Sequence, residues 1–278
     1  MPDLIEVFIQ RWKWITGLTL ICTVLAAAVA LLRPKEYLSS ATALPVNSVV
    51  SDKAHLFNNN IEALYSDFGS PDELDRIEGT GALDTLYIAL ANSFHLPDHY
   101  MEGSLKNGVY TAAMRLKKNS DVSRSAYGEL KVKVWDRDPV MAAKLANALM
   151  QSIQSLHQHL QNESNMMVLQ KIEEDYALRK QQYTQLADSL SRLSGAEAEL
   201  ATARKKMMLD QLIQYEQMMA QYKLAVNANP RVLLTVENAR PALYPDKPKV
   251  LSTVLFVLFG SFLFAFVTAL FMQTRKPF

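Results

Sequence analysis

The sequence predicts an α+β membrane protein in which two membrane-spanning helices flank one large domain. Residues 15–32 and 250–272 contain no charged side chain, and each is long enough as a helix to cross a bilayer core of about 30 Å. One strand-like segment follows the first span and another precedes the second. A stretch of 89 residues, 139–227, lies between them and contains no proline after its first residue. We therefore expect a small membrane-proximal β-sheet and a very long, coiled-coil-like helix.

The two apolar segments divide the chain into five parts. We expect a tail over 1–14, a span over 15–32, a domain over 33–249, a span over 250–272 and a tail over 273–278. A cleaved signal peptide is the alternative for the first segment, because Ala26, Ala28 and Ala30 resemble a cleavage site. The 18-residue length of the segment, and the acidic and tryptophan residues before it, favour a retained anchor.

The charges of the tails indicate the orientation of the chain. Two spans place both tails on one side, and a loop as long as 33–249 is not governed by the positive-inside rule. Arg11 and Lys13 in the first tail, and Arg275 and Lys276 in the second, favour the cytoplasm for both. Basic residues also flank the spans on the loop side and argue against this. We expect the tails inside and the domain outside.

Three segments of the domain have the pattern of strands. Tyr37–Val46 reads as a strand that ends near Pro45. Arg231–Glu237 reads as another, and because each of the two attaches to a membrane helix, we expect them to pair. Glu129–Trp135 alternates apolar residues with lysines, as a strand with one buried face does.

Short helices are expected between the strand over 37–46 and the strand over 129–135. Ser70 followed by Pro71 is a helix-start signal. A helix over Leu83–Phe94 carries leucines at three- and four-residue spacing, and Pro97 is expected to end it. Residues 47–70 show no clear period and are interpreted as a loop that contains a short helix near Ala63.

One helix of roughly 130 Å is expected over residues 139–227. Asp138 can accept amide protons at its start, and Pro139 already has a helical φ. An apolar seam at three- and four-residue spacing runs to Leu200, slips by one residue and resumes at Met208. Gly195 lies inside the seam and costs about 1 kcal/mol relative to alanine. We expect the helix to continue through Gly195 or to kink there at most.

This order of elements resembles the bacterial chain-length determinants, the Wzz-type polysaccharide co-polymerases. Three local sequences carry the resemblance: the early strand Tyr37–Leu44, the stretch Tyr127–Leu149, and Ala239–Leu251 with Pro241, Pro245 and Pro248 before the second span. The most specific pattern is a strand followed by Asp-Pro and then small residues at helical spacing. Its residues are Asp138, Pro139, Ala142, Ala143, Ala146 and Asn147.

The resemblance implies a non-enzymatic inner-membrane protein whose periplasmic domains assemble into a ring-like homo-oligomer. Such a ring regulates the chain length of a lipopolysaccharide or exopolysaccharide, with a polysaccharide polymerase or an outer-membrane exporter as partner. The chain ends six residues after Met272 and has no GxxxxGK[ST] phosphate loop, so a cytoplasmic kinase would be a separate chain. The alternative is a structural adaptor of an envelope-spanning export machine that bridges to an outer-membrane partner.

The sequence shows no pattern of catalytic or metal-binding side chains, and we expect no cofactor. His157 and His159 point to different helix faces, and Pro97 denies His95 and His99 a shared face. The 29 basic side chains nearly balance the 28 acidic ones, which gives no indication of nucleic-acid binding.

Two groups of side chains are candidates for contacts. Small residues at four-residue spacing in the spans let helix backbones approach closely, so we expect these faces to pack the spans together or against a neighbouring subunit or polymerase. They are Ala26, Ala30, Ser261, Ala265 and Ala269. Cations on the long helix are candidates for glycan or inter-subunit contacts, although a solvated helix face is the simpler interpretation. They are Arg179, Lys180, Arg204, Lys205 and Lys206.

Overall fold

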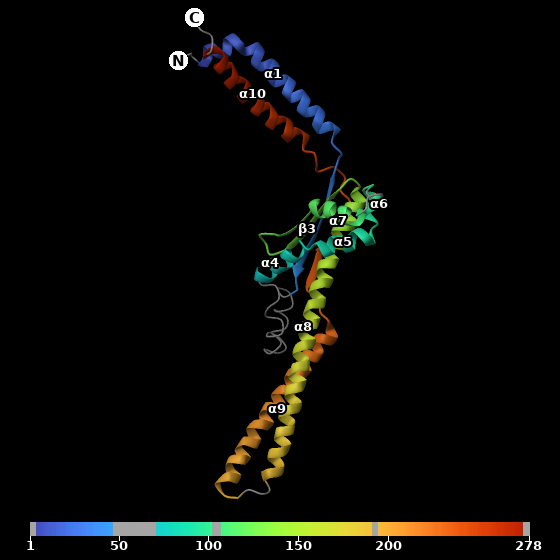
Figure 1. Ribbon diagram of the computed structural model, residues 1–278, viewed down its shortest axis with the longest axis vertical. Coiled ribbons are helices and arrows are strands. Elements are labelled where there is room, and N and C mark those ends of the chain that lie inside the picture. The colour runs from blue at the N-terminus through green and yellow to red at the C-terminus, as the bar shows by residue number, and fades with distance from the viewer. Residues whose placement is uncertain (1–3, 47–70, 102–106, 191–193, 275–278) are drawn as a thin grey trace. The chain divides into compact units, whose positions relative to one another are not determined.

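A computed structural model describes residues 4–46, 71–101, 107–190 and 194–274 (Figure 1). The chain forms two compact units. The first comprises 1–40, 133–146 and 239–278, and the second comprises 41–132 and 147–238. Ser70, and the loop predicted over 47–70 with its short helix near Ala63, lie outside the described residues.

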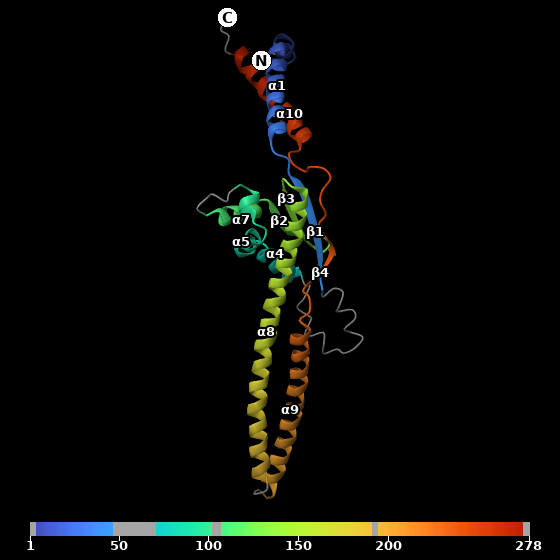
Figure 2. The ribbon, with the colours of Figure 1, turned by 90° about the vertical axis from the view of Figure 1, so that its right-hand side faces the viewer.

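Two long apolar helices lie side by side in the first unit, as Figures 1 and 2 show. They are α1 (Leu4–Leu32), whose backbone departs from helical angles at Arg11, and α10 (Val250–Thr274). Arg11–Leu32 and Val250–Phe271 are long and apolar enough to cross a membrane. Only 11% of an apolar 18-residue stretch within each is buried in the protein. The core helix of a soluble protein would be mostly buried, so this exposure fits contact with lipid.

A four-stranded sheet has the order β2-β3-β1-β4. Its strands are β1 (Tyr37–Pro45), β2 (Ser120–Arg124), β3 (Leu130–Asp136) and β4 (Leu233–Glu237). β1 and β4 pair antiparallel, with Thr42 opposite Glu237 and Pro45 opposite Leu233, so the predicted pairing is confirmed. β3 buries every second residue, as its alternating sequence predicts. β2 was not expected, because Ser-Asp-Val-Ser-Arg contains a single apolar residue.

Four short helices belong to the second unit: α4 (Pro71–Thr80), α5 (Asp84–Ser93), α6 (Leu96–His99) and α7 (Gly108–Lys118). α4 begins at Pro71, and α5 lies between its caps Leu83 and Phe94, as predicted. The role assigned to Pro97 is wrong. Pro97 lies in the first turn of α6, where its missing N–H would have no helical partner in any case.

The single long helix predicted over 139–227 is also wrong. The chain instead forms α8 (Pro139–Leu190) and α9 (Ala196–Ala228). Gly195 precedes α9 with φ 67° and ψ −142°, a conformation that glycine adopts far more readily than other residues. Gly195 is therefore a residue of the connection and not of a helix interior. The 52 residues of α8 alone make a helix of roughly 78 Å.

His157 lies on α8 in the second unit, with its Nε2 2.7 Å from Thr80 Oγ1. The Thr80 hydroxyl donates to the Ile77 carbonyl at 2.7 Å, so its oxygen is placed to accept the Nε2–H of a neutral imidazole. Burial lowers the pKa of His157 below its ordinary value. A charged form is thus disfavoured at this position.

We expect the protein to lose stability on mild acidification through His157. The pKa is lower in the folded than in the unfolded state, where it is about 6.5, so the unfolded state binds more protons. Neutral His157 leaves the folded protein at its full stability above about pH 6.5. The free energy of unfolding decreases as the pH falls from there toward the folded pKa of His157. His157→Gln should flatten this dependence in thermal unfolding from about pH 5 to 7.5. The exposed His159→Gln is the control, and an unchanged profile in His157→Gln would refute the assignment.

Candidate functional site: contact surfaces

The segment before α10 is held to β1 and β3 by a group of polar contacts, which we call the juxtamembrane clasp: Glu36, Trp135, Asp246 and Lys247. The indole Nε1–H of Trp135 donates to Asp246 Oδ2 at 2.8 Å. Lys247 Nζ lies 4.2 Å from the Trp135 ring centroid and 3.5 Å from the Glu36 carboxylate. The Glu36 N–H also donates to the Lys247 carbonyl at 3.0 Å.

The clasp fixes the position of the proline-rich segment of the chain. Two clasp residues, Asp246 and Lys247, belong to this segment, and Pro245 and Pro248 flank them. Pro241 lies four residues before Pro245. Because proline restricts φ, the connector is stiff as well as anchored. The clasp had no signal in the sequence, since Trp135 and Asp246 are 111 residues apart.

Removing the indole donor of the clasp should destabilise the first unit. Trp135→Phe keeps an aromatic face for Lys247 and leaves Asp246 without the indole N–H, at a cost of about 1–3 kcal/mol for a hydrogen bond to a charged group. Thermal unfolding of the purified protein measures this cost. In the Asp246→Ala background, which has no side-chain acceptor, the same change should cost less, and equal costs in the two backgrounds would show that the bond contributes nothing.

Asp138 and Pro139 start α8 within the first unit. Asp138 Oδ1 accepts the Val140 N–H at 2.9 Å, which is a side-chain cap, and the Asp138 N–H donates to the buried Asp136 carboxylate at 2.9 Å. Ala142 and Ala146 are fully buried, and Asn147 is half-buried. These contacts give the Asp-Pro motif a structural role at the start of α8.

The two apolar helices meet through small side chains. Ala265 and Ala269 of α10 are completely buried and form a cluster with Ile15 of α1. Ala30 is buried as well, whereas Ala26 and Ser261 are half-buried. Side chains of this size allow close approach of two helix backbones in a membrane.

The distal part of α8 and the helix α9 lie antiparallel (Figures 1 and 2), and we call this pair the helical arm. In its polar contacts the residue number rises along α8 as it falls along α9, as in an antiparallel pair. Lys223 Nζ is 2.8 Å from Glu173, and the Tyr176 hydroxyl donates to Glu216 at 2.6 Å, which raises the pKa of Tyr176. Arg179 donates to Gln211 at 2.7 Å and to the Tyr215 hydroxyl at 3.2 Å.

The candidate cations of the arm differ in their surroundings. Arg179 is engaged between the helices, as described above. Lys180 and Lys205 lie 5.9 Å and 5.6 Å from the ring centroids of Tyr176 and Tyr183. Arg204 and Lys206 are exposed, so these two are placed best for a contact outside the chain.

The arm also exposes large apolar side chains. They include Leu160, Met166, Met167, Leu178, Leu200, Met207, Ile213 and Leu224. Where exposed apolar side chains lie next to one another, they form the kind of surface that another protein covers. Leu200 is among them, although the sequence pattern placed it in the apolar seam.

A polar pocket of about 230 Å³ lies in the second unit between α8 and β4. Asn147, Gln151 and Gln154 share one face of α8, while Arg231, Thr235 and Asn238 approach from the β4 segment. Amide and guanidinium groups can bond hydroxyl and carboxylate groups. Within the described ranges, no group of three or more His, Cys, Asp or Glu side chains is placed to hold a metal ion.

Comparison with a protein-family model supports the resemblance to chain-length determinants. Residues 2–73 match the family model described as chain length determinant protein (Wzz). A solved structure of a full-length bacterial polysaccharide co-polymerase is 14% identical over 98% of both chains, with a TM-score of 0.38. A fragment of WzzB, the polysaccharide co-polymerase from Salmonella Typhimurium, is 14% identical over 77% of this chain and all of its own, with a TM-score of 0.35. No curated protein matches the chain.

Proposed function

We propose that this chain is an inner-membrane polysaccharide co-polymerase, a non-enzymatic oligomeric scaffold that regulates the chain length of a bacterial surface or secreted polysaccharide. The match of residues 2–73 to the chain length determinant model carries the proposal. Two terminal helices able to span a membrane, with a sheet and a long helical arm between them in the sequence, are consistent with it.

In the proposed topology both tails are cytoplasmic and the domain over 33–249 is periplasmic. Arg11 and Lys13 before the first span, and Arg275 and Lys276 after the second, support this orientation. The packing of Ile15 against Ala265 and Ala269 supports a retained first helix rather than a cleaved signal peptide.

Identical copies of the chain would assemble through the helical arm and the apolar helices. The exposed apolar side chains of the arm supply area that association would remove from water, at about 25 cal/mol per Å² before the cost of association. A closed ring of such copies would present the same surface at regular intervals. Polymerase copies or growing glycans would be held at these repeated positions.

Two regions of the second unit are candidates for contact with the glycan. Arg204 and Lys206 are exposed on the arm and would attract an acidic polymer through a charge interaction that salt weakens. The polar pocket around Gln151 and Arg231 offers amide and guanidinium donors to sugar hydroxyls and carboxylates.

Deletion of the gene in its host tests the proposed function. Two quantities are measured in the deletion strain, the wild type and a complemented strain: the total polysaccharide and its size distribution on a gel. We expect the preferred length to be lost while synthesis continues, and to return on complementation. Loss of all exported polymer, with an outer-membrane protein that co-purifies with the chain, would instead indicate an export adaptor. No change in either quantity would refute both functions.

A further inference from the structure

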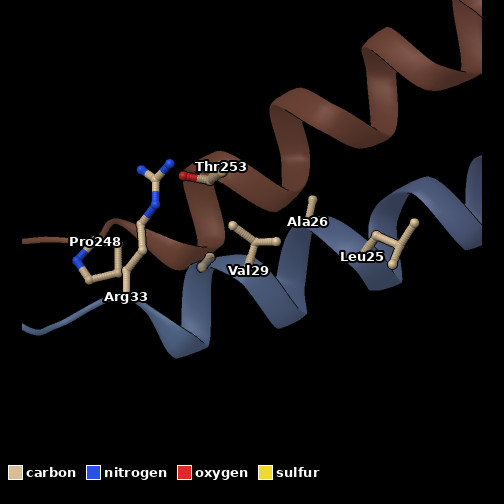
Figure 3. Close-up of a pocket in the computed structure, with 7 residues that line it drawn as sticks. Leu25, Ala26, Val29, Arg33, Pro248 and Thr253 are labelled. Atoms are coloured by element: carbon tan, nitrogen blue, oxygen red, sulfur yellow. The ribbon is translucent and has the colours of Figure 1, made fainter.

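The first unit contains a groove of about 280 Å³ where α1 ends and α10 begins. Figure 3 shows it between the two helices. The lining residues are Leu25, Ala26, Val29, Ala30, Arg33, Pro248 and Thr253. Five of the seven come from the last turns of α1 or from the start of α10, while Arg33 directly follows α1 and Pro248 lies just before α10.

The groove is apolar along α1 and cationic at one end. Leu25 and Val29 are exposed along its length, and the small side chains of Ala26 and Ala30 leave the space between the helices open. Arg33 follows the last residue of the span, and its side chain extends toward Thr253 in Figure 3. Arg33 is exposed and has neither a hydrogen bond nor an ion pair within the part of the chain that the structure describes.

We propose that this groove binds one anionic glycerophospholipid, with an acyl chain along Leu25 and Val29 and the head-group phosphate on Arg33. The end of a span lies at the level of the lipid head groups. A guanidinium binds phosphate through two parallel N–H bonds. An acyl chain supplies the dispersion contacts that an empty groove would lack.

Charge distinguishes this occupant from a second copy of the chain. Neither 15–32 nor 250–272 contains an acidic residue, so the spans of a neighbouring copy have no carboxylate to offer Arg33. A zwitterionic lipid would bring its ammonium group close to the Arg33 guanidinium, whereas the net charge of an anionic head group is attracted to that guanidinium.

Native mass spectrometry of the full-length protein tests the proposal. The protein is released from nanodiscs of phosphatidylglycerol and phosphatidylcholine in equal amounts, and the retained lipids are counted. We expect retention of phosphatidylglycerol in preference to phosphatidylcholine. Arg33→Gln should lower phosphatidylglycerol retention about tenfold, the effect of losing one hydrogen bond to a charged group. Lys35→Gln, two residues away and outside the groove, should change it less than about twofold.

A second pair of variants tests the groove itself. Val29→Trp should fill it and displace the lipid while Arg33 remains, whereas Leu32→Trp, at a position 84% exposed and outside the lining, should not. Equal losses in Arg33→Gln and Lys35→Gln, or equal retention of both lipids, would overturn the proposal. Displacement by equimolar polyprenyl phosphate would overturn it in favour of a polyprenyl lipid. Polysaccharide length is not a readout, so this result is separate from that of the gene deletion.

Discussion

Replacing Ala265 and Ala269 together with leucine is expected to force α1 and α10 apart and to change the length distribution of the polysaccharide. Both alanines are completely buried against Ile15, and leucine adds three carbon atoms at each position. Overpacking of a close contact costs about 1–3 kcal/mol per site. Because the membrane supplies no hydrophobic force between two apolar helices, their association depends on this close packing.

The measurement is the polysaccharide profile of the deletion strain complemented with each variant, at matched protein levels in the membrane. Ala28→Leu with Gly260→Leu is the control pair. Both positions are exposed, and a Cβ atom added at Gly260 would meet no atom of a neighbouring element within 4 Å. The control pair should restore the wild-type profile. A wild-type profile from the Ala265 and Ala269 variant would show that this packing is not required for length control.

Truncation of Leu149 to alanine is expected to have the largest effect on stability. Leu149 is fully buried on α8, one turn from the buried Leu145 and Ile153. Leu→Ala at such a site costs about 2–5 kcal/mol through lost transfer energy and the cavity left behind. In a domain of this size, the melting temperature should fall by roughly 4–20 °C.

Circular dichroism at 222 nm of the purified full-length protein measures the effect, because α8 and α9 contribute much of the helical signal. Val140→Ala is the control on the same helix. Val140 is 46% exposed and lies at the start of α8, outside the helical arm, so its truncation should change stability by less than about 0.5 kcal/mol. Equal melting temperatures for the two variants would contradict the burial of the α8 face.

Elements that are determined by residues close together in the sequence could be predicted. A membrane span needs about 20 apolar residues and can satisfy its backbone as a helix, so 15–32 and 250–272 were recognisable. The alternation of β3 and the Asp138–Pro139 start of α8 are local patterns as well. The pairing of β1 with β4 followed from their common attachment to the membrane helices.

The helical arm shows why the remainder was not predictable. Three- and four-residue spacing is the same in one continuous helix and in two antiparallel helices, because periodicity carries no information on chain direction. The slip near Leu200 lies soon after α9 begins and was the available signal. A cost of about 1 kcal/mol for Gly195 was too small to predict a chain reversal.

Long-range contacts explain the missed parts of the candidate sites. The juxtamembrane clasp joins Trp135 to Asp246, and the polar pocket joins α8 to the β4 segment. Neither pair of segments has a shared local pattern. Arg179 was a candidate for contact with a glycan or another subunit, with a solvated helix face as the simpler interpretation, and the structure places it between α8 and α9 on Gln211 and Tyr215.

The central claim is that copies of this chain form the scaffold that sets polysaccharide length. The most direct measurement is the mass of the full-length wild-type protein in nanodiscs, taken by native mass spectrometry at micromolar concentration. The account predicts one dominant species that contains several copies of the chain. A monomer at that concentration, in nanodiscs large enough for an assembly, would contradict it.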